Sequence, residues 1–383
     1  MSIIIFIAIL AVLILIHEFG HFIAAKKNGV WVEEFGFGLP PRIFGIKKGE
    51  TLYSINWIPL GGFVKLYGEE YHEIKNQRSK IKDQKAFINK KPWQKAIVVA
   101  AGVIMNLILG ISLFYVVLTS NNFQSDPIPV LTNIKFRFGN QIKKVIIARV
   151  NKNSPAEKSN IKSEDVVIKY KVDNQDWKEI SSASEFIQVV KNSKDSTVTF
   201  DLLNNKNGDR KIVSVKPVFN KDLNRYIIGV NLADVVILKY STTTEKLLSG
   251  VYHSYNLIDY NLKVISSLFS QAVKEKNVET VSQAFSGPIG IFAVIEDTVK
   301  SSGKKLVTNL LNITGLLSLS LALMNILPFP ALDGGRMVFV VYEWITGKKS
   351  NKEIEKYVNL IGFILLITFG IVISINDVVK FFR

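Results

Sequence analysis

The sequence has no cysteine and only four histidines among 383 residues. The absence of cysteine excludes disulfide bonds and thiolate metal ligands, although it does not indicate a compartment. No lysine or arginine precedes Lys26, whereas a cleavable signal peptide begins with a basic region. We therefore predict that the first hydrophobic segment is kept as a membrane span.

The net charge of +16 does not coincide with a motif that recognises nucleic acid. Attraction of basic side chains to anionic lipid on the cytoplasmic face is the simpler explanation. We therefore predict the lipid bilayer as a partner and no binding of nucleic acid.

Hydrophobic residues make up 48% of the chain, and they gather in long windows. A transmembrane helix needs about 20 apolar residues. The windows of this length are Ile3–Ala25, Ala96–Thr119, Leu306–Leu327 and Tyr357–Ile375. The predicted fold class is a polytopic α-helical membrane protein with four transmembrane helices and one inserted external α/β domain.

Short loops rich in lysine and arginine lie on the cytoplasmic side of a membrane. Residues 28–95 and 336–356 carry such charges, so we place them in the cytoplasm and place both termini outside. The predicted organisation is helix 1 at 1–27, a cytoplasmic and re-entrant β region at 28–95, helix 2 at 96–119, an external region at 120–240, an amphipathic helix and linker at 241–305, helix 3 at 306–335, a loop at 336–356, and helix 4 with an external C-terminus at 357–383.

An HExxH motif, His17-Glu18-Phe19-Gly20-His21, lies inside the first predicted span. Residues i and i+4 share one face of a helix, so His17 and His21 can reach one metal ion. Glu18 can then take a proton from a water molecule at that metal, a pattern typical of zinc metalloproteases. Ionisable groups are costly in lipid, which itself indicates a functional site.

Two histidines leave such a site one protein ligand short. His72 lies in a charged stretch and His253 in an external amphipathic segment, so neither is a good candidate. Asp333 is better placed, because the prolines after the third span end that helix and leave irregular backbone where a cavity can form. Taken alone, however, Asp333-Gly334 is also a common turn pair.

The HExxH motif, together with NxxPxPxLDG at Asn325–Gly334 and a PDZ-like segment between them, resembles the site-2 protease family of intramembrane zinc metalloproteases. The resemblance covers essentially the whole chain and is greatest to the bacterial branch of regulator of sigma-E proteases. It implies that His17, His21 and Asp333 bind one Zn²⁺ ion and that Glu18 is the catalytic base. It also links Asn325, Pro328 and Pro330 to substrate handling.

The same resemblance implies a location in the bacterial inner membrane, with the N-terminus, the PDZ-like domain and the C-terminus on the periplasmic side. The implied substrates are single-span membrane proteins, namely anti-sigma factors already cleaved outside the membrane and remnant signal peptides. A non-catalytic membrane adaptor with a PDZ-like domain is the alternative, but it would not need Glu18. A histidine-rich lipid desaturase would need more than four histidines.

Residues 30–67 are rich in residues that favour β structure, and they predict four short strands. They form either an ordinary cytoplasmic hairpin pair or a sheet that enters the membrane interface, and Ile58–Phe63 resembles the re-entrant β segment of the family. An exposed strand edge can pair with an unwound peptide. We therefore predict that residues 60–65, with Gly61, Gly62 and Phe63, bind extended substrate.

In the second predicted span, Gly102, Asn106 and Gly110 are spaced four residues apart, which favours close helix packing. A place for Asn106 near the zinc ion or the substrate is the other interpretation. We prefer packing, and leave Asn106 outside the predicted catalytic set.

Residues 145–218 predict a small α/β module that resembles a PDZ domain, with Ser154-Pro155-Ala156 opening its first helix. Asn160 and Glu164 stand where such domains have glycine. The module either binds a peptide ligand or excludes substrates with bulky external parts. Beyond it, Thr242–Ala272 predicts an amphipathic helix that Thr242 and Glu245 open as a capping box. The role of Gly287–Gly290, which resembles a family motif, does not follow from the residues.

Overall fold

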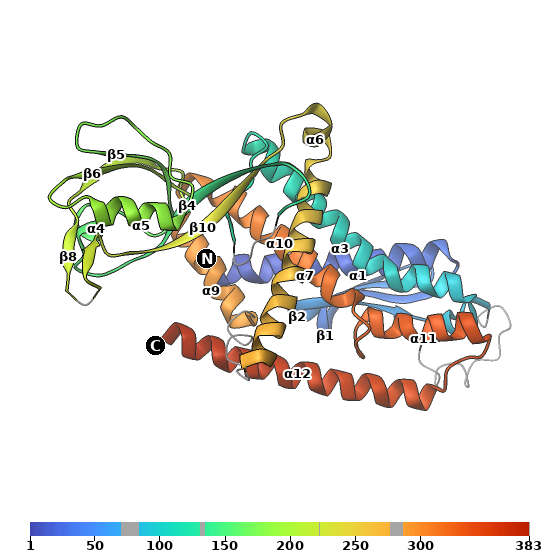
Figure 1. The fold of residues 1–383 in the computed structure, drawn as a ribbon. Coiled ribbons are helices and arrows are strands. Elements are labelled where there is room, and N and C mark those ends of the chain that lie inside the picture. The colour runs from blue at the N-terminus through green and yellow to red at the C-terminus, as the bar shows by residue number, and fades with distance from the viewer. Residues whose placement is uncertain (70–83, 131–134, 222, 276–285, 383) are drawn as a thin grey trace. The chain divides into compact units, whose positions relative to one another are not determined.

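The computed structural model describes residues 1–69, 84–130, 135–221, 223–275 and 286–382 (Figure 1). The chain forms two compact units. The first contains Met1–Leu113, Leu268–Glu296 and Asn312–Arg383, and the second contains Phe114–Ser267 and Asp297–Leu311. His72, which the sequence made a poor candidate for a metal ligand, lies outside the described residues.

Four helices of the described residues are long and apolar enough to cross a membrane. They fall on the four predicted windows, so the prediction of a multi-pass α-helical membrane protein is confirmed. The helices are α1 (Ser2–Lys27), α3 (Pro92–Ser120), α10 (Leu306–Ile326) and α12 (Lys352–Phe382).

Helix α10 ends at Ile326, two residues before Pro328, as the missing N–H groups of the prolines predict. A further helix, α11 (Asp333–Thr346), begins at Asp333. The prediction of a loop over residues 336–356 is therefore wrong for its first part. Gly334 and Gly335 disfavour a helix by propensity, but here they allow the first turn of α11 to touch the preceding backbone. A Cβ on Gly334 would lie 2.0 Å from the carbonyl oxygen of Leu327, and one on Gly335 would lie 2.3 Å from that of Phe329.

Small residues bring the helices of the first unit close together. A Cβ on Gly20 of α1 would lie 2.4 Å from the carbonyl oxygen of Ala101 on α3. On the same helix, a Cβ on Gly110 would lie 2.7 Å from Leu319 of α10. The close packing predicted for Gly110 is thus confirmed, and α3 contacts both α1 and α10.

Strands β1 (Val32–Lys48) and β2 (Thr51–Leu66) lie beside α1 (Figure 1). Phe22 of α1 packs on Phe35 of β1, and their ring centroids are 5.0 Å apart. They join at Gly49, whose φ of 64° is readily adopted only by glycine. Each strand bends back on itself, so the four predicted short strands are halves of two long ones.

The register of these halves gives a sheet with two edges, residues 62–65 at one and residues 42–48 at the other. Residues 34–37 of β1 pair on one side with 65–62 of β2 and on the other with 52–55. Residues 42–48 of β1 pair with 56–51. Within the described residues, the segment 62–65 therefore pairs on one side only.

The second unit contains a six-stranded sheet of described residues, in the order β3-β10-β4-β5-β6-β7. Its strands are β3 (Ile128–Pro129), β4 (Asn140–Val150), β5 (Asp165–Val172), β6 (Val198–Asn204), β7 (Arg210–Val215) and β10 (Val230–Lys239). The helices α4 (Pro155–Lys158) and α5 (Ala183–Asn192) follow the predicted order. A short pair, β8 (Val218–Asn220) with β9 (Arg225–Ile227), lies outside this sheet.

The bounds predicted for this module, 145–218, are too narrow. Strand β4 begins at Asn140, and β10, from Val230 to Lys239, pairs with it along its length. The apolar side chains of β10 complete the sheet, since Val235 and Leu238 are fully buried. Asn160 and Glu164, which stand where glycine was expected, both have positive φ angles, 60° and 68°. The backbone thus keeps the glycine-like conformation without glycine.

The predicted amphipathic helix is two helices, α6 (Thr243–Leu247) and α7 (Ser249–Glu275), and the predicted capping box of Thr242 and Glu245 is confirmed. Single turns of 3₁₀ helix cover Phe87–Asn89 and Gly303–Lys305. Helix α9 (Pro288–Ser301) follows the Gly287–Gly290 motif. The backbone N–H groups of Gly287 and Gly290 donate to the buried carboxylate of Asp377 on α12, at 2.8 and 2.9 Å, which caps α9.

Candidate metal centre and active site

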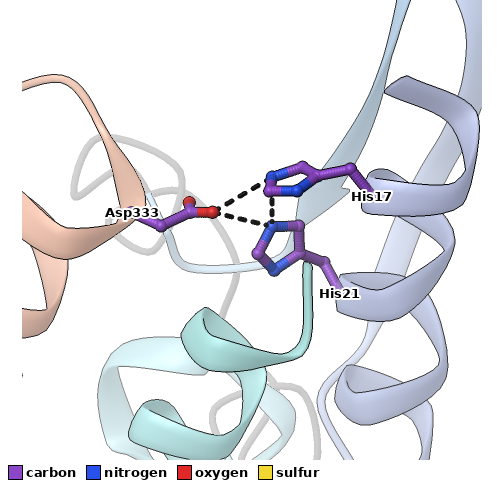
Figure 2. Close-up of side chains that lie close together, drawn as sticks. All are labelled: His17, His21 and Asp333. Carbon is purple, nitrogen blue, oxygen red and sulfur yellow. Dashed lines mark hydrogen bonds and ion pairs between the residues drawn. The ribbon is translucent and has the colours of Figure 1, made fainter. Parts of the chain in front are cut away.

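His17, His21 and Asp333 meet at one point, although more than 300 residues of chain separate the carboxylate from the imidazoles (Figure 2). The Oδ2 atom of Asp333 lies 3.0 Å from Nε2 of His17 and 3.3 Å from Nε2 of His21. The two Nε2 atoms are 3.2 Å apart. The three side chains are between 12% and 16% exposed.

This arrangement fits a zinc ion. Donor atoms about 2.0–2.2 Å from a tetrahedral zinc ion lie roughly 3.3–3.5 Å from one another, close to the spacing seen here. The Oδ2 atom of Asp333 is buried and accepts no hydrogen bond within the described part of the chain. A cation between the three atoms would satisfy this carboxylate oxygen. Two histidines and one carboxylate also leave a fourth position open, as catalytic zinc sites require.

Helix α3 holds the imidazole of His21. The Nδ1 atom of His21 lies 2.8 Å from the carbonyl oxygen of Val98 on α3. A carbonyl oxygen can only accept, so Nδ1 carries the proton and Nε2 is left free to bind a metal. One turn further along α3, a Cβ on Gly102 would lie 2.3 Å from Nε2 of His21 and 2.7 Å from the ring of His17. Position 102 therefore needs glycine, because any larger side chain would collide with the two imidazoles.

Contacts on both sides of the helix break fix the position of Asp333. The backbone N–H of Ala331 donates to the side-chain oxygen of Asn359 on α12, at 3.2 Å. Pro330 packs so closely against Gly362 that a Cβ there would lie 2.4 Å from it. Helix α11, which begins with Asp333, is tied to α3 by an ion pair of 2.8 Å between Lys95 and Glu343.

A cavity of about 320 Å³ opens beside the three ligand atoms. Glu18 lines it, with its Cγ atom 3.5 Å from the point where a Cβ on Gly62 would stand. Glu18 therefore shares the cavity with the imidazoles and lies close to Gly62, at the open edge of β2 formed by residues 62–65. On the cavity wall, Arg336 of α11 pairs with Glu69.

The residues predicted to contact substrate divide into two groups. Phe63 and Asn325 line the cavity, and Gly62 lies next to Glu18. Gly61, Pro328 and Pro330 are not among the lining residues. Pro330 instead supports the backbone before Asp333 through its contact with Gly362.

Several residues that surround the ligands were not predicted as site residues. They are Val98, Gly102, Asn106, Glu69 and Arg336. The first three lie four residues apart on α3. In the sequence, the spacing of Gly102, Asn106 and Gly110 allowed either a place for Asn106 near the zinc ion or helix packing, and packing was preferred. For Asn106 that interpretation is incomplete, because its side-chain nitrogen lies 3.4 Å from Nδ1 of His17.

A family model described as Peptidase family M50 matches residues 5–369. The match reaches into all four candidate spans and includes all three residues of the metal cluster. The chain belongs to Peptidase family M50, the site-2 protease family.

Curated relatives agree over their full length. A protein of Clostridium acetobutylicum is 35% identical over 378 residues, which cover 97% of this chain and 96% of the relative. One of Fusobacterium nucleatum subsp. nucleatum is 32% identical over 387 residues, with 100% of both chains covered. One of Clostridium perfringens is 29% identical over 96% of this chain and 95% of the relative. Each is named "putative zinc metalloprotease". The chain is thus a zinc metalloprotease with zinc as its cofactor.

Proposed function

We propose that this protein is an intramembrane endopeptidase in which His17, His21 and Asp333 hold the zinc ion. One observation carries the proposal. The two histidines and Glu18 lie on α1, a helix long and apolar enough to span a membrane, and they face a cavity together with Asp333. Ionisable side chains are costly to place in a membrane span, so their presence there supports a reaction that takes place within the membrane.

Zinc, when bound, supplies a Lewis acid that polarises the carbonyl of the scissile bond and makes a nearby water more acidic. Glu18 accepts the proton of the attacking water and later donates it to the leaving amine. Phe63 and Asn325 line the cavity in which this reaction would take place. Val98 and Gly102 keep the imidazoles in place while this occurs.

The open edge of β2, residues 62–65, is the proposed binding strand for the substrate. A helical substrate hides its amide groups in its own hydrogen bonds, and unwinding would leave them unpaired at a high cost. Pairing with the edge would satisfy them. The proximity of Glu18 to Gly62 supports this, because a peptide lying along the edge would pass beside the proposed base.

The proposed substrates are transmembrane segments of single-span membrane proteins, with pre-cleaved anti-sigma factors and remnant signal peptides as the two classes. We further propose a bacterial inner membrane location, with residues 28–95 in the cytoplasm and the sheet of the second unit in the periplasm. That sheet would serve as a PDZ-like module, which either binds a peptide or excludes bulky substrates. Its strand order supports this proposal. So do the positive φ angles at Asn160 and Glu164, the two positions where such domains have glycine.

The central test uses Glu18→Gln and His17→Ala with a tagged single-span substrate and a zinc determination. We expect Glu18→Gln to bind one zinc ion and to lose cleavage, and His17→Ala to lose both. Cleavage by Glu18→Gln at the wild-type rate would refute the role of Glu18. Zinc binding by His17→Ala at the wild-type affinity would refute the ligand assignment.

A further inference from the structure

Asn106 is the most deeply buried polar side chain next to the proposed metal ligands. It is 0% exposed. Its Nδ2 atom lies 3.4 Å from Nδ1 of His17, and its Oδ1 atom is buried and has no hydrogen-bond partner among the described residues. A buried amide oxygen without a partner destabilises the folded protein, so the arrangement calls for an explanation.

The two nitrogens of His17 face different neighbours. Nε2 lies 3.0 Å from Asp333 and 3.2 Å from Nε2 of His21, on the side of the metal centre. Nδ1 faces Asn106. If Nε2 binds zinc, the neutral ring must carry its proton on Nδ1. That N–H needs an acceptor, whereas the NH₂ group of an amide can only donate.

A half-turn of the Asn106 amide exchanges its oxygen and nitrogen at almost no steric cost, because the two groups have nearly the same size. The exchange brings Oδ1 to the side of Nδ1 of His17. It gives the unpartnered oxygen a donor and the Nδ1–H an acceptor in one step. His17 would then match His21, whose Nδ1–H donates to the carbonyl oxygen of Val98.

We propose that Asn106 is a positioning residue of the metal centre: its amide oxygen accepts the Nδ1–H of His17 and so keeps Nε2 of His17 free for zinc. This inference rests on the proposed role of His17 as a ligand. The fixed backbone around Asn106 supports it, since the carbonyl oxygen of Asn106 accepts from Ser318 of α10 at 2.7 Å. That bond holds α3 against α10 without using the side chain of Asn106.

The same four-residue spacing gives each position on α3 its own task. Val98 orients His21, Gly102 leaves room for both rings, and Asn106 orients His17. One helix face thus fixes the orientation of both imidazoles. The close packing predicted for this face holds the helix, and the amide of Asn106 adds a contact that packing alone would not require.

The variants Asn106→Leu and Asn106→Asp separate shape from hydrogen bonding. Leucine has nearly the shape of asparagine but accepts no hydrogen bond, whereas aspartate keeps an acceptor. Loss of an outer-shell partner typically lowers metal affinity about 10–100-fold. We expect this loss in Asn106→Leu, measured on the full-length protein in detergent by competition with a zinc chelator. Asn106→Asp should stay within about threefold of the wild type.

Ser318→Ala is the matched control. It removes the bond to the backbone of Asn106 but leaves the amide, so zinc affinity should not change. Wild-type affinity in Asn106→Leu would overturn the proposal. An equal loss in both Asn106 variants would also overturn it, because that result would make the residue a packing element.

Nitrogen NMR of the zinc-loaded wild-type protein, with ¹⁵N-labelled histidine, gives a test that needs no folded variant. We expect the Nδ1 of His17 to carry the proton and Nε2 to bind the metal, and a protonated Nε2 would overturn the inference. If the wild type bound no zinc, the ligand assignment itself would be wrong. Failure of the inference about Asn106 can thus be told apart from failure of the proposed zinc site.

Discussion

Buried histidines in the two units show how neighbours decide what an imidazole does. His17 and His21 of the first unit face each other and a carboxylate, beside a cavity. His253 of the second unit is 5% exposed, lies against the ring of Phe114 and pairs with the hydroxyl of Tyr240 at 3.2 Å. The first pair can hold a metal ion, whereas His253 is a satisfied part of a core.

This contrast separates the expected effects of mutation. Changes around His17 and His21 should alter zinc binding or cleavage more than stability. Changes around His253 should alter stability and leave zinc content unchanged.

The largest effect is expected at the open edge of β2. Proline at Val64 removes an N–H from the segment 62–65 and should abolish cleavage, a loss of about 100-fold or more, while the protein still binds one zinc ion. Ile46→Pro on the opposite edge of the same strand pair is the control, and it should retain most activity. The measurement is turnover of a tagged single-span substrate together with zinc content. Equal turnover in the two variants would exclude the edge as the binding strand.

A smaller effect is expected at Gly102. A methyl group there collides with both imidazoles, so Gly102→Ala should lower zinc affinity about 10–100-fold. Gly110→Ala is matched on the same helix, because its methyl meets the flexible side chain of Leu319 instead. Chelator competition should detect a loss in the first variant only. A loss shared by both would show that the packing of α3, and not direct contact with the rings, controls the affinity.

The smallest effect on zinc binding and cleavage is expected at His253, where the change concerns the pH dependence of stability in the second unit. Burial lowers the pKa of His253 to about 4. The unfolded chain takes up a proton near pH 6.5 that the folded chain refuses until about pH 4, so stability is lost as the pH falls through this range. The loss amounts to roughly 3 kcal/mol when complete.

His253→Gln removes this titration. Thermal unfolding of both proteins between pH 7 and about pH 4 should give a shallower slope in the variant, with equal zinc content at pH 7. Parallel slopes would mean that His253 is not held neutral by burial. Because both proteins carry the same metal ligands, acid release of zinc cancels in the comparison.

Much of the fold follows from local pattern. The four spans, the break before Pro328, and the capping box at Thr242 depend on composition or on residues a few positions apart, and each is found where expected. Within the site, HExxH sets the spacing of His17 and His21 by helix geometry alone. Asp333 needed the family resemblance, because an Asp-Gly pair by itself also fits a turn.

The remaining features depend on contacts between distant segments. Whether Asn106 faces a lipid, a neighbouring helix or His17 is set by the rotation of α3, which four-residue spacing does not determine. Helix α11 was missed because Gly334 and Gly335 have poor helix propensity, and their contacts with Leu327 and Phe329 outweigh that propensity. Strand β10 joins the sheet through β4, about 80 residues earlier in the chain. No local pattern specifies such a pairing.

The distribution of the ligand residues along the chain bears on when the enzyme can first act. During synthesis, His17 and His21 emerge first, and more than 300 residues must follow before Asp333 is made. On the proposed assignment, a ribosome-bound or prematurely terminated chain has the base and two ligands but lacks a complete centre. The protease therefore cannot cut neighbouring nascent membrane proteins while it is being made. Incomplete products of its own gene would be harmless for the same reason.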